Sequence, residues 1–290
     1  MFAIKKFARR VASCDRVSMH IITVANRKGG VGKSSVTTHL AAALGIRGSR
    51  VLVIDMDSQA STTSMLLERL DDDSPTTTQL LLGQAKLGNI IRRSTRDGVD
   101  VAPSCGELTR AQFAIAGKTG RETILRRALR EVDYNFVLID TAPELQLATL
   151  NALVAATDVL MPFTPDPMAL EGLRTTTEAV AEIVAAELAT PKILGCLQIA
   201  YDRRLAVTEQ SREQVSAAYG DLLFDTRVRA NSSFIVCPAW HRDIFAMERE
   251  EQQRSRGSQD FLALADEVIE RVGLAKSVFH SAASISPPPN

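Results

Sequence analysis

The chain has 290 residues, no formal net charge at pH 7 and 45% hydrophobic residues, which is typical of a globular protein with a sizeable core. The balanced charge argues against a chain that is basic throughout and binds nucleic acid over its whole surface. Four widely spaced cysteines, Cys14, Cys105, Cys196 and Cys237, and four histidines without ligand spacing argue against a disulfide framework and a zinc site.

Residues 1–18 form a basic extension ahead of the first predicted strand. A helix here would place two kinds of side chain on opposite faces, apolar Phe2, Ile4, Phe7 and Val11 against basic Lys5, Lys6, Arg9 and Arg10. Such a helix binds anionic membranes or DNA phosphates. Met19 stands directly before the strand, and we therefore favour the simpler interpretation of an upstream extension or a misassigned start.

A glycine-rich loop at residues 26–35 follows a predicted buried strand at residues 21–25 and precedes apolar residues at helical spacing. Glycines at 29, 30 and 32 allow successive backbone N–H groups to face phosphate oxygens at the start of the helix. Lys33 can reach the β and γ phosphates, and the Ser34 hydroxyl can bind Mg²⁺. The loop therefore predicts a nucleoside triphosphate site.

Two residues of this loop depart from the usual pattern G-x-x-x-x-G-K-[ST]. Arg27 stands where the first glycine is expected, and Lys28 precedes the Gly-Gly pair. A lone lysine is usually a solvated surface residue. Directly before Gly29 in a phosphate loop, Lys28 is better interpreted as a second phosphate contact.

Carboxylates follow two further predicted buried strands. Asp55 and Asp57 end the apolar run at residues 51–54, and Asp140 ends the run at residues 136–139. Ligands bind at the carboxyl ends of parallel strands, so these acids belong to the same predicted site. Asp140 is placed to hold Mg²⁺ through water. The alternative is that Asp55 and Asp57 only cap the turn that follows.

The rest of the chain continues the alternation of strands and helices. Further strands are predicted at residues 99–102, 159–161, 193–200 and 222–224, with a polar surface loop at residues 71–78. This rhythm indicates an α/β fold with a mostly parallel, twisted sheet and helices on both faces. We expect one domain over residues 19–275 and a disordered Ser- and Pro-rich tail at residues 276–290.

Over about residues 19–273 the chain resembles the ParA family of deviant Walker ATPases. The resemblance is carried by the motifs at residues 28–35, 51–59, 137–143 and 169–173. It implies a three-layer P-loop NTPase fold that binds ATP and Mg²⁺ and forms a homodimer with ATP. In that dimer Lys28 would reach the partner's nucleotide, much as an arginine finger does.

The family's roles carry over onto individual positions. The resemblance implies a phosphate- and magnesium-binding loop of Lys28, Gly29, Gly30, Val31, Gly32, Lys33, Ser34 and Ser35. Asp57 would position the attacking water, Asp140 would be the Walker B acid, and Asn231 would lie near the adenine. Catalysis would rest on Lys28, Lys33 and Asp57. The family usually has proline where this chain has Ser58 and Ala142, and neither change removes a charged catalytic group.

Five arginines fall in the region whose counterparts in DNA-binding relatives contact the DNA backbone: Arg203, Arg204, Arg227, Arg229 and Arg242. By the resemblance, Arg204 matches one family arginine. Ser233 stands at the position of a second family arginine. Any one of these arginines alone is more typical of a solvated or ion-paired surface residue. As a group they predict non-specific, salt-sensitive DNA binding.

The resemblance implies a cytoplasmic, nucleoid-associated ATPase that partitions a plasmid or chromosome and is stimulated by a ParB-like partner. One alternative is the positioning of a protein cargo such as a carboxysome or a chemotaxis cluster. Another is a MinD-like membrane ATPase, which the Ser- and Pro-rich C-terminus argues against. An iron–sulfur carrier lacks recognisable cysteine spacing, and a binding-only regulator conflicts with the presence of Lys33, Asp57 and Asp140.

Overall fold

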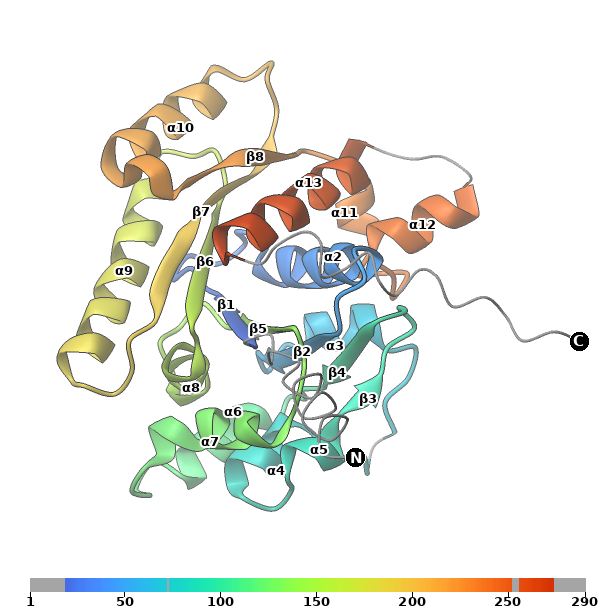
Figure 1. Cartoon of the computed structure of the whole chain (residues 1–290), viewed down its shortest axis with the longest axis vertical. Coiled ribbons are helices and arrows are strands. Elements are labelled where there is room, and N and C mark those ends of the chain that lie inside the picture. The colour runs from blue at the N-terminus through green and yellow to red at the C-terminus, as the bar shows by residue number, and fades with distance from the viewer. Residues whose placement is uncertain (1–18, 72, 252–255, 274–290) are drawn as a thin grey trace, which may run out of the picture.

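The computed structural model describes residues 19–71, 73–251 and 256–273, so the predicted extension at 1–18 and tail at 276–290 lie outside the described residues. Eight strands form one sheet in the order β3-β4-β2-β5-β1-β6-β7-β8 (Figure 1). In chain order the strands are β1 His20–Val24, β2 Val51–Met56, β3 Arg92–Arg93, β4 Val99–Ala102, β5 Phe136–Thr141, β6 Asp158–Phe163, β7 Lys192–Tyr201 and β8 Leu223–Arg229.

Helices connect the strands. The α-helices are α2 Lys33–Ile46, α3 Ser61–Leu66, α4 Thr77–Leu82, α5 Leu87–Ile90, α6 Leu108–Ala114, α7 Ile124–Ala128, α8 Leu147–Ala155, α9 Ala169–Ala185, α10 Ala206–Tyr219, α11 Ser233–Val236, α12 Ile244–Glu251 and α13 Arg256–Arg271. Short 3-10 turns lie at η1 Arg121–Thr123, η2 Leu129–Glu131 and η3 Gly220–Leu222. None of the helices in the described part of the chain is long and apolar enough to cross a membrane.

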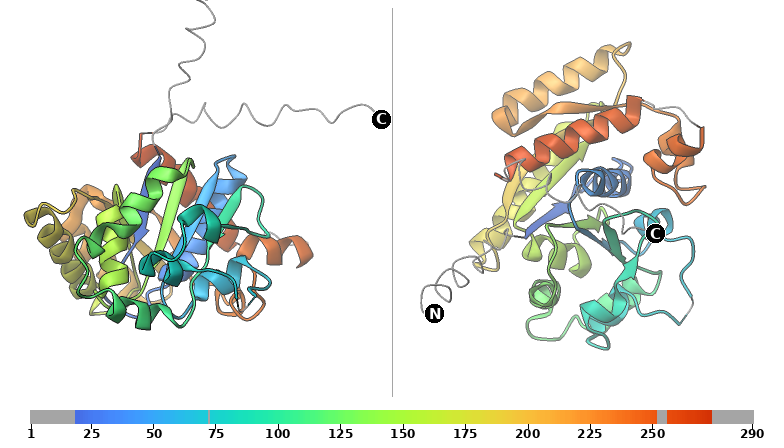
Figure 2. Two further views of the ribbon diagram at one scale, coloured as in Figure 1. Left: turned by 90° about the horizontal axis from the view of Figure 1, so that it is seen from below. Right: turned by 45° about the vertical axis from the view of Figure 1, so that its right-hand side comes forward.

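Both faces of the sheet are buried because the strands are apolar on both sides. Along β2, Val51 and Val53 pack into a core with α2 and α13, whereas Leu52 and Ile54 face a second core with α8. A third core lies between β6, β7, α9 and α10. Figure 2 shows the resulting layers, with helices on either side of the twisted sheet. The predicted three-layer fold is confirmed.

Strand pairing is parallel throughout, except that β3 pairs antiparallel with β4. The register places Asp140 of β5 beside Val24 of β1 and beside Asp55 of β2. Because the carboxyl ends of these three strands lie side by side, the phosphate loop and both acidic motifs lie close together at that end of the sheet.

The prediction of a polar surface loop at residues 71–78 was wrong for its last three residues. Thr76 caps α4 through a capping box with Gln79, and Thr76, Thr77 and Thr78 are buried. The Thr77 hydroxyl donates a hydrogen bond to the Asp55 carbonyl oxygen at 3.0 Å. Threonine is tolerated in this interior because its hydroxyl is paired. The short antiparallel strand β3 was not predicted at all.

Candidate nucleotide site

The loop between β1 and α2 has the backbone conformation that its glycines permit. Gly30 has φ 73° and Gly32, the residue before α2, has φ 66°, and other residues rarely adopt these values. A Cβ atom added at Gly32 would lie 2.5 Å from Ile199 Cδ1. Val31 is buried, whereas Gly29 and Gly30 are exposed. The loop therefore presents backbone N–H groups, and little else, at the start of α2.

Asn26 fixes the loop to the rest of the sheet. Its Nδ2 donates to the Pro162 carbonyl oxygen at 2.8 Å, and its Oδ1 accepts from the Lys28 backbone N–H at 2.8 Å. The Arg27 backbone N–H donates to Thr176 Oγ1 on α9 at 3.1 Å. Asn26 is buried, and sequence reasoning assigned it no role. These contacts hold the loop in place through β6 and α9.

Lys33 lies across the loop, with 7% of the residue exposed. Its ammonium donates to the carbonyl oxygens of Asn26 at 3.1 Å and Lys28 at 3.3 Å. Burial lowers the pKa of Lys33, and the nearby Asp140, Asp57 and Glu144 oppose that effect. A partly desolvated cation gains more from an anionic ligand than a solvated one does. Lys33 is therefore well suited to bind phosphate.

Asp140 is the second-last residue of β5 and is completely buried. Its Oδ2 accepts a hydrogen bond from the Thr62 hydroxyl at 2.7 Å. Burial raises the pKa of Asp140, and hydrogen bonds from Ser34 and Thr62 oppose that rise. The structure thus brings Ser34 and Asp140 together, as predicted for the magnesium site. A hydroxyl and a carboxylate are oxygen donors of the kind Mg²⁺ prefers, so the residues present fit the ion.

The two acids after β2 have different environments. Asp55 is buried and accepts hydrogen bonds from the Asp57 N–H at 3.0 Å and the Thr63 N–H at 2.9 Å. Both acids make turn contacts of the kind that the alternative describes, and a further role for either one stays a prediction. Asp57 is partly exposed, accepts one hydrogen bond from the Gln59 N–H at 2.9 Å, and lines a cavity of about 290 Å³ together with Glu144. Asp57 is thus available to a solvent-accessible ligand.

A cavity of about 520 Å³ opens beside the loop glycines. Gly30, Gly32 and Ser35 of the loop line it together with Asn231. Its walls are largely apolar: Val36, Ile199, Val228, Phe234 and Phe261. An apolar slot that continues from a phosphate loop suits a nucleobase. Asn231 lines this cavity, and its predicted position near the adenine stays a prediction.

Lys28 forms an ion pair within its own chain. Its Nζ lies 2.5 Å from Oδ1 of Asp166, in the turn between β6 and α9. Sequence reasoning did not single out Asp166. The signal was available, because Asp166 follows a parallel strand at its carboxyl end, as Asp57 and Asp140 do.

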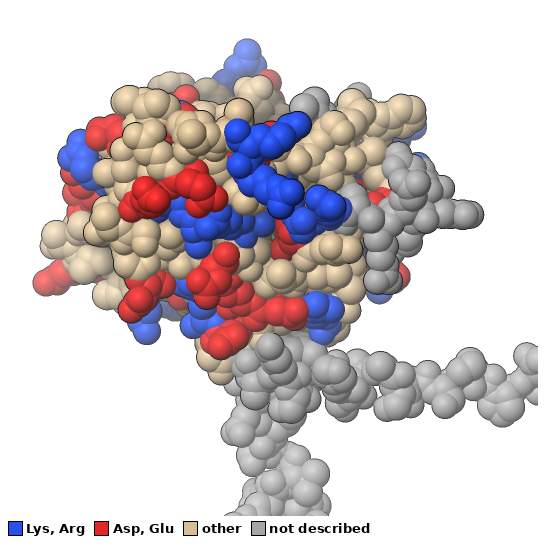
Figure 3. Space-filling view, turned by 90° about the horizontal axis from the view of Figure 1, so that it is seen from above, with Lys and Arg blue, Asp and Glu red and all other residues tan. Residues whose placement is uncertain are grey.

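The predicted DNA arginines do not all line one cavity. Arg203, Arg204 and Arg229 line a cavity of about 320 Å³, whereas Arg242 lines a separate cavity with Trp240. Arg227 lies on β8 and its guanidinium is 5.0 Å from the centroid of the Tyr201 ring. Figure 3 views the α10, β8 and α13 end of the molecule, where basic side chains gather between acidic ones.

Three of these arginines are paired with carboxylates. The N–O distances are 2.6 Å for Arg204–Asp202, 2.6 Å for Arg227–Glu209 and 2.5 Å for Arg229–Asp260. Ion pairing of this kind agrees with the alternative interpretation of each arginine taken singly. The grouping of Arg203, Arg204 and Arg229 around one cavity is what the alternative does not explain, and DNA binding stays a prediction.

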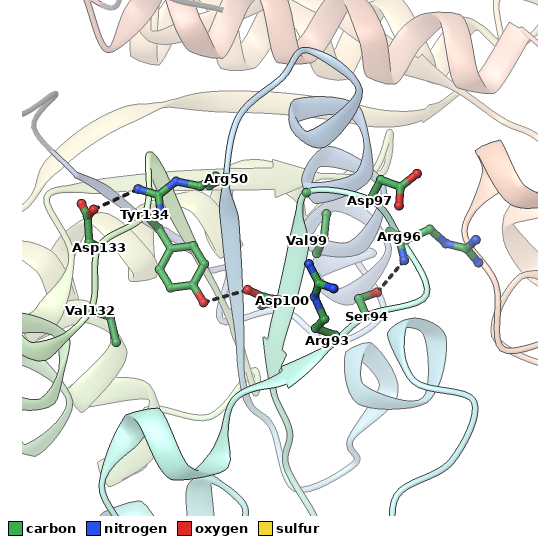
Figure 4. Close-up of a pocket in the computed structure, with 11 residues that line it drawn as sticks. Arg50, Arg93, Ser94, Arg96, Asp97, Val99, Asp100, Val132, Asp133 and Tyr134 are labelled. Carbon is green, nitrogen blue, oxygen red and sulfur yellow. Dashed lines mark hydrogen bonds and ion pairs between the residues drawn. The ribbon is translucent and has the colours of Figure 1, made fainter. Parts of the chain in front are cut away.

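A cavity of about 490 Å³ lies at the other end of the strands, near the amino ends of β2, β4 and β5 (Figure 4). The Tyr134 hydroxyl donates to Asp100 Oδ2 at 2.9 Å, and Arg50 pairs with Asp133 at 3.0 Å. These side chains satisfy one another across the cavity, and none belongs to the nucleotide loop. The cavity is therefore separate from the candidate site.

Comparisons with known proteins show the family to which the chain is related. A family model described as an AAA domain matches residues 19–192. The chromosome-partitioning ATPase Soj of Thermus thermophilus is 34% identical over 89% of this chain and 98% of its own length. The chromosome partitioning protein ParA of Myxococcus xanthus is 32% identical over 87% of this chain and 88% of its own length.

A solved structure of cobyrinic acid a,c-diamide synthase from Mycobacterium smegmatis, with an ATP analogue and magnesium bound, has a TM-score of 0.76 and 26% identity. It covers 88% of this chain and 96% of that one. Its ligands agree with the ATP and Mg²⁺ predicted from the loop. The loop, the two acidic motifs, the three-layer fold and these relatives together lead to one conclusion: the chain belongs to the ParA family of P-loop ATPases.

Proposed function

We propose that this protein is a ParA-type ATPase that forms ATP-dependent sandwich dimers, binds DNA without sequence preference and partitions a plasmid or chromosome. The observation that carries the proposal is the loop itself, where Lys33 contacts the Lys28 carbonyl oxygen and lies near Asp57 and Asp140. The chromosome-partitioning relatives support the choice of cargo. The proposed location is cytoplasmic and nucleoid-associated.

Hydrolysis in this proposal rests on positioning and charge. The loop N–H groups and Lys33 bind and neutralise the phosphates, and Asp57 orients the attacking water. Ser34 and Asp140 would hold Mg²⁺, Asp140 through water, and the ion would neutralise charge on the phosphate oxygens when bound. Basal turnover of ATP is slow in this proposal, and a ParB-like partner stimulates it.

Dimerisation places Lys28 against the nucleotide of the partner subunit, so nucleotide binding and dimer formation are one event. DNA binding rests on the arginine-lined cavity. That cavity shares Ala230 and Asn231 with the cavity beside the loop glycines. Because one wall serves both cavities, nucleotide occupancy and the arginine surface are structurally adjacent, which supports ATP-dependent DNA binding.

The first experiment measures binding to non-specific duplex DNA with ATP, with ADP and without nucleotide, at low and moderate salt. Wild type is compared with Lys28→Ala, Arg204→Ala and the control Arg130→Ala, whose arginine is exposed and lies in η2. We expect ATP-dependent, salt-sensitive binding that both Lys28→Ala and Arg204→Ala reduce and the control retains. ATP-driven dimers without DNA affinity would contradict the partitioning function and favour membrane recruitment, which liposome sedimentation then tests.

A second experiment separates hydrolysis from assembly. Asp57→Ala should leave ATP-dependent dimers able to form but unable to turn over ATP, as measured by light scattering and phosphate release. Asp133→Ala, which removes an exposed carboxylate at the opposite edge of the sheet, is the control. Unchanged turnover in Asp57→Ala would remove the water-positioning role from this residue.

A further inference from the structure

Lys28 is held at three points within its own chain. Its backbone N–H donates to Asn26 Oδ1 at 2.8 Å, its carbonyl oxygen accepts from Lys33 Nζ at 3.3 Å, and its own Nζ pairs with Asp166 Oδ1 at 2.5 Å. Backbone and side chain are thus both fixed. A side chain held in this way points toward α9 of its own subunit.

Asp166 is itself built into the turn that begins α9. Its Oδ1 accepts from the Met168 N–H at 2.8 Å, and its Oδ2 accepts from the Thr164 hydroxyl at 2.8 Å. Burial would raise the pKa of Asp166, but hydrogen bonds from Lys28, Thr164 and Met168 hold it below its usual value. The carboxylate is therefore ionised and oriented at neutral pH.

Gly172 on α9 brings the helix close to the loop. A Cβ atom at this position would lie 2.7 Å from Asn26 Oδ1 and 3.1 Å from Lys28 Cβ. Only glycine allows this approach, which sets α9 and the Asp166 turn within reach of the lysine. The packing of α9 against the loop therefore brings the two charged groups together.

We propose that Asp166 is a restraint on Lys28, an inference that rests on the proposed function. A lysine paired with Asp166 cannot also reach phosphates in a partner subunit, so dimerisation requires this ion pair to break. Phosphate binding assists the exchange, because Lys33 must then leave the Lys28 carbonyl and turn to the nucleotide. The Asp166 pair would therefore set the ATP concentration at which subunits assemble.

The test is the ATP concentration for half-maximal dimerisation, measured by light scattering on the full chain carrying Asp57→Ala to prevent turnover. Asp166→Asn removes the charge, keeps one acceptor oxygen for the Met168 N–H, and places an amide NH2 that can donate to the Thr164 hydroxyl. We expect Asp166→Asn to lower the ATP concentration for half-maximal dimerisation by about twofold to fivefold. This range corresponds to the free energy of one partly exposed ion pair. Asp166→Glu, which restores the charge, should return the midpoint toward the parent value.

Glu171→Gln is the matched control, because Glu171 lies in the first turn of the same helix and pairs with Arg174, at 2.9 Å. It should leave the midpoint unchanged. A midpoint that is unchanged or raised in Asp166→Asn, with unaltered thermal stability, would overturn the restraint. If the parent protein forms no dimer with ATP, the proposed function itself fails, and the two failures are therefore distinguishable.

Discussion

The cations of the nucleotide loop and those of the arginine-lined cavity, Arg203, Arg204 and Arg229, have different surroundings. Lys33 is almost buried, and its hydrogen bonds go to two backbone carbonyl oxygens, which carry no net charge. The Arg204 side chain is 84% exposed, and its Nε and Nη2 donate hydrogen bonds to the carboxylate of Asp202. An arriving phosphate thus displaces dipoles at the first cation and a full negative charge at the second.

The difference shows what each region suits. A desolvated cation on a rigid loop gains strongly from one small anion, because burial keeps the local dielectric low. A solvated, paired arginine gains little from any single phosphate, and an extended polyanion must contact several such groups at once. We expect substitutions in the loop to have large effects and substitutions on the surface to have small, salt-dependent ones.

The strongest test of the loop is Lys33→Ala. Removing one preorganised cation from a phosphate site should lower ATP turnover by about 10²–10³-fold and weaken ATP binding. Phosphate release and calorimetric titration measure the two effects. Lys192→Ala, in which an exposed lysine at the start of β7 is removed, should match wild type. Turnover within threefold of wild type in Lys33→Ala would place the essential cation elsewhere.

The buried His39 of α2 packs against the wall of the cavity beside the loop. Its ring packs against Phe234 and Phe261, both of which line the cavity beside the loop, with centroids at 5.2 Å and 5.0 Å. Burial lowers the pKa of His39 to about 4; the neighbouring Asp243 raises it and Arg96 lowers it further. The folded protein therefore binds fewer protons at His39 than the unfolded chain does between pH 6.5 and 4.

Because the unfolded state binds more protons in this window, the free energy of unfolding should fall as the pH falls from 6.5 to 4, by up to about 3 kcal/mol. Urea titrations at pH 7, 6 and 5 measure this loss. His39→Gln removes the titrating group and should show a shallower pH dependence across the same window. Equal slopes for the two proteins would show that other groups cause the acid instability.

Gly32→Ala tests whether the loop requires its backbone conformation. Gly32 has φ 66°, and a Cβ there would lie 2.5 Å from Ile199 Cδ1, in the wall of the base cavity. We expect a loss of about 1–2 kcal/mol in stability, together with weaker ATP binding. Gly29→Ala is the control, because no atom lies within 4 Å of its Cβ position. Similar losses in both variants would mean that exposure of N–H groups matters more than φ.

The loop was predictable from sequence because strand, glycines, Lys33 and Ser34 are neighbours along the chain. Asp140 was equally predictable, since it ends a buried strand. The difference in burial between Asp55 and Asp57 could not be predicted in advance, because it depends on the hydrogen bonds that Thr63 of α3 makes to Asp55. The burial of Thr76 was readable in principle from the Thr76-x-x-Gln79 capping box, which the polar composition of the segment obscured.

The pairing of surface arginines could not be predicted, because each partner is brought in by the fold. Asp260 of α13 reaches Arg229 only because that helix packs along β8. The same holds for Asp166 and Lys28, which meet through the packing of α9 on the loop. The sequence shows where the charged residues are along the chain, but it does not show which residue each of them pairs with in the folded protein.

Asp202→Asn is the smallest of the expected effects and bears most directly on the comparison. Asp202 lies beside Arg204, whose hydrogen bonds lower the pKa of this carboxyl to about 2, so the pair is intact at any pH near neutral. If Arg204 binds phosphate, Asp202 competes with it. Removing the charge should then raise the affinity for duplex DNA with ATP by about twofold at low salt, and less at higher salt.

Asp221→Asn removes a carboxylate from η3 on the same end of the molecule without freeing Arg204, and it controls for net charge. The double variant Asp202→Asn with Arg204→Ala should bind no better than Arg204→Ala alone, because the competing acid matters only while its arginine is present. Equal gains from Asp202→Asn and Asp221→Asn would instead show that DNA responds to overall charge. In that case the arginine-lined cavity would have no special part in binding, and the contrast with the preformed loop would be complete.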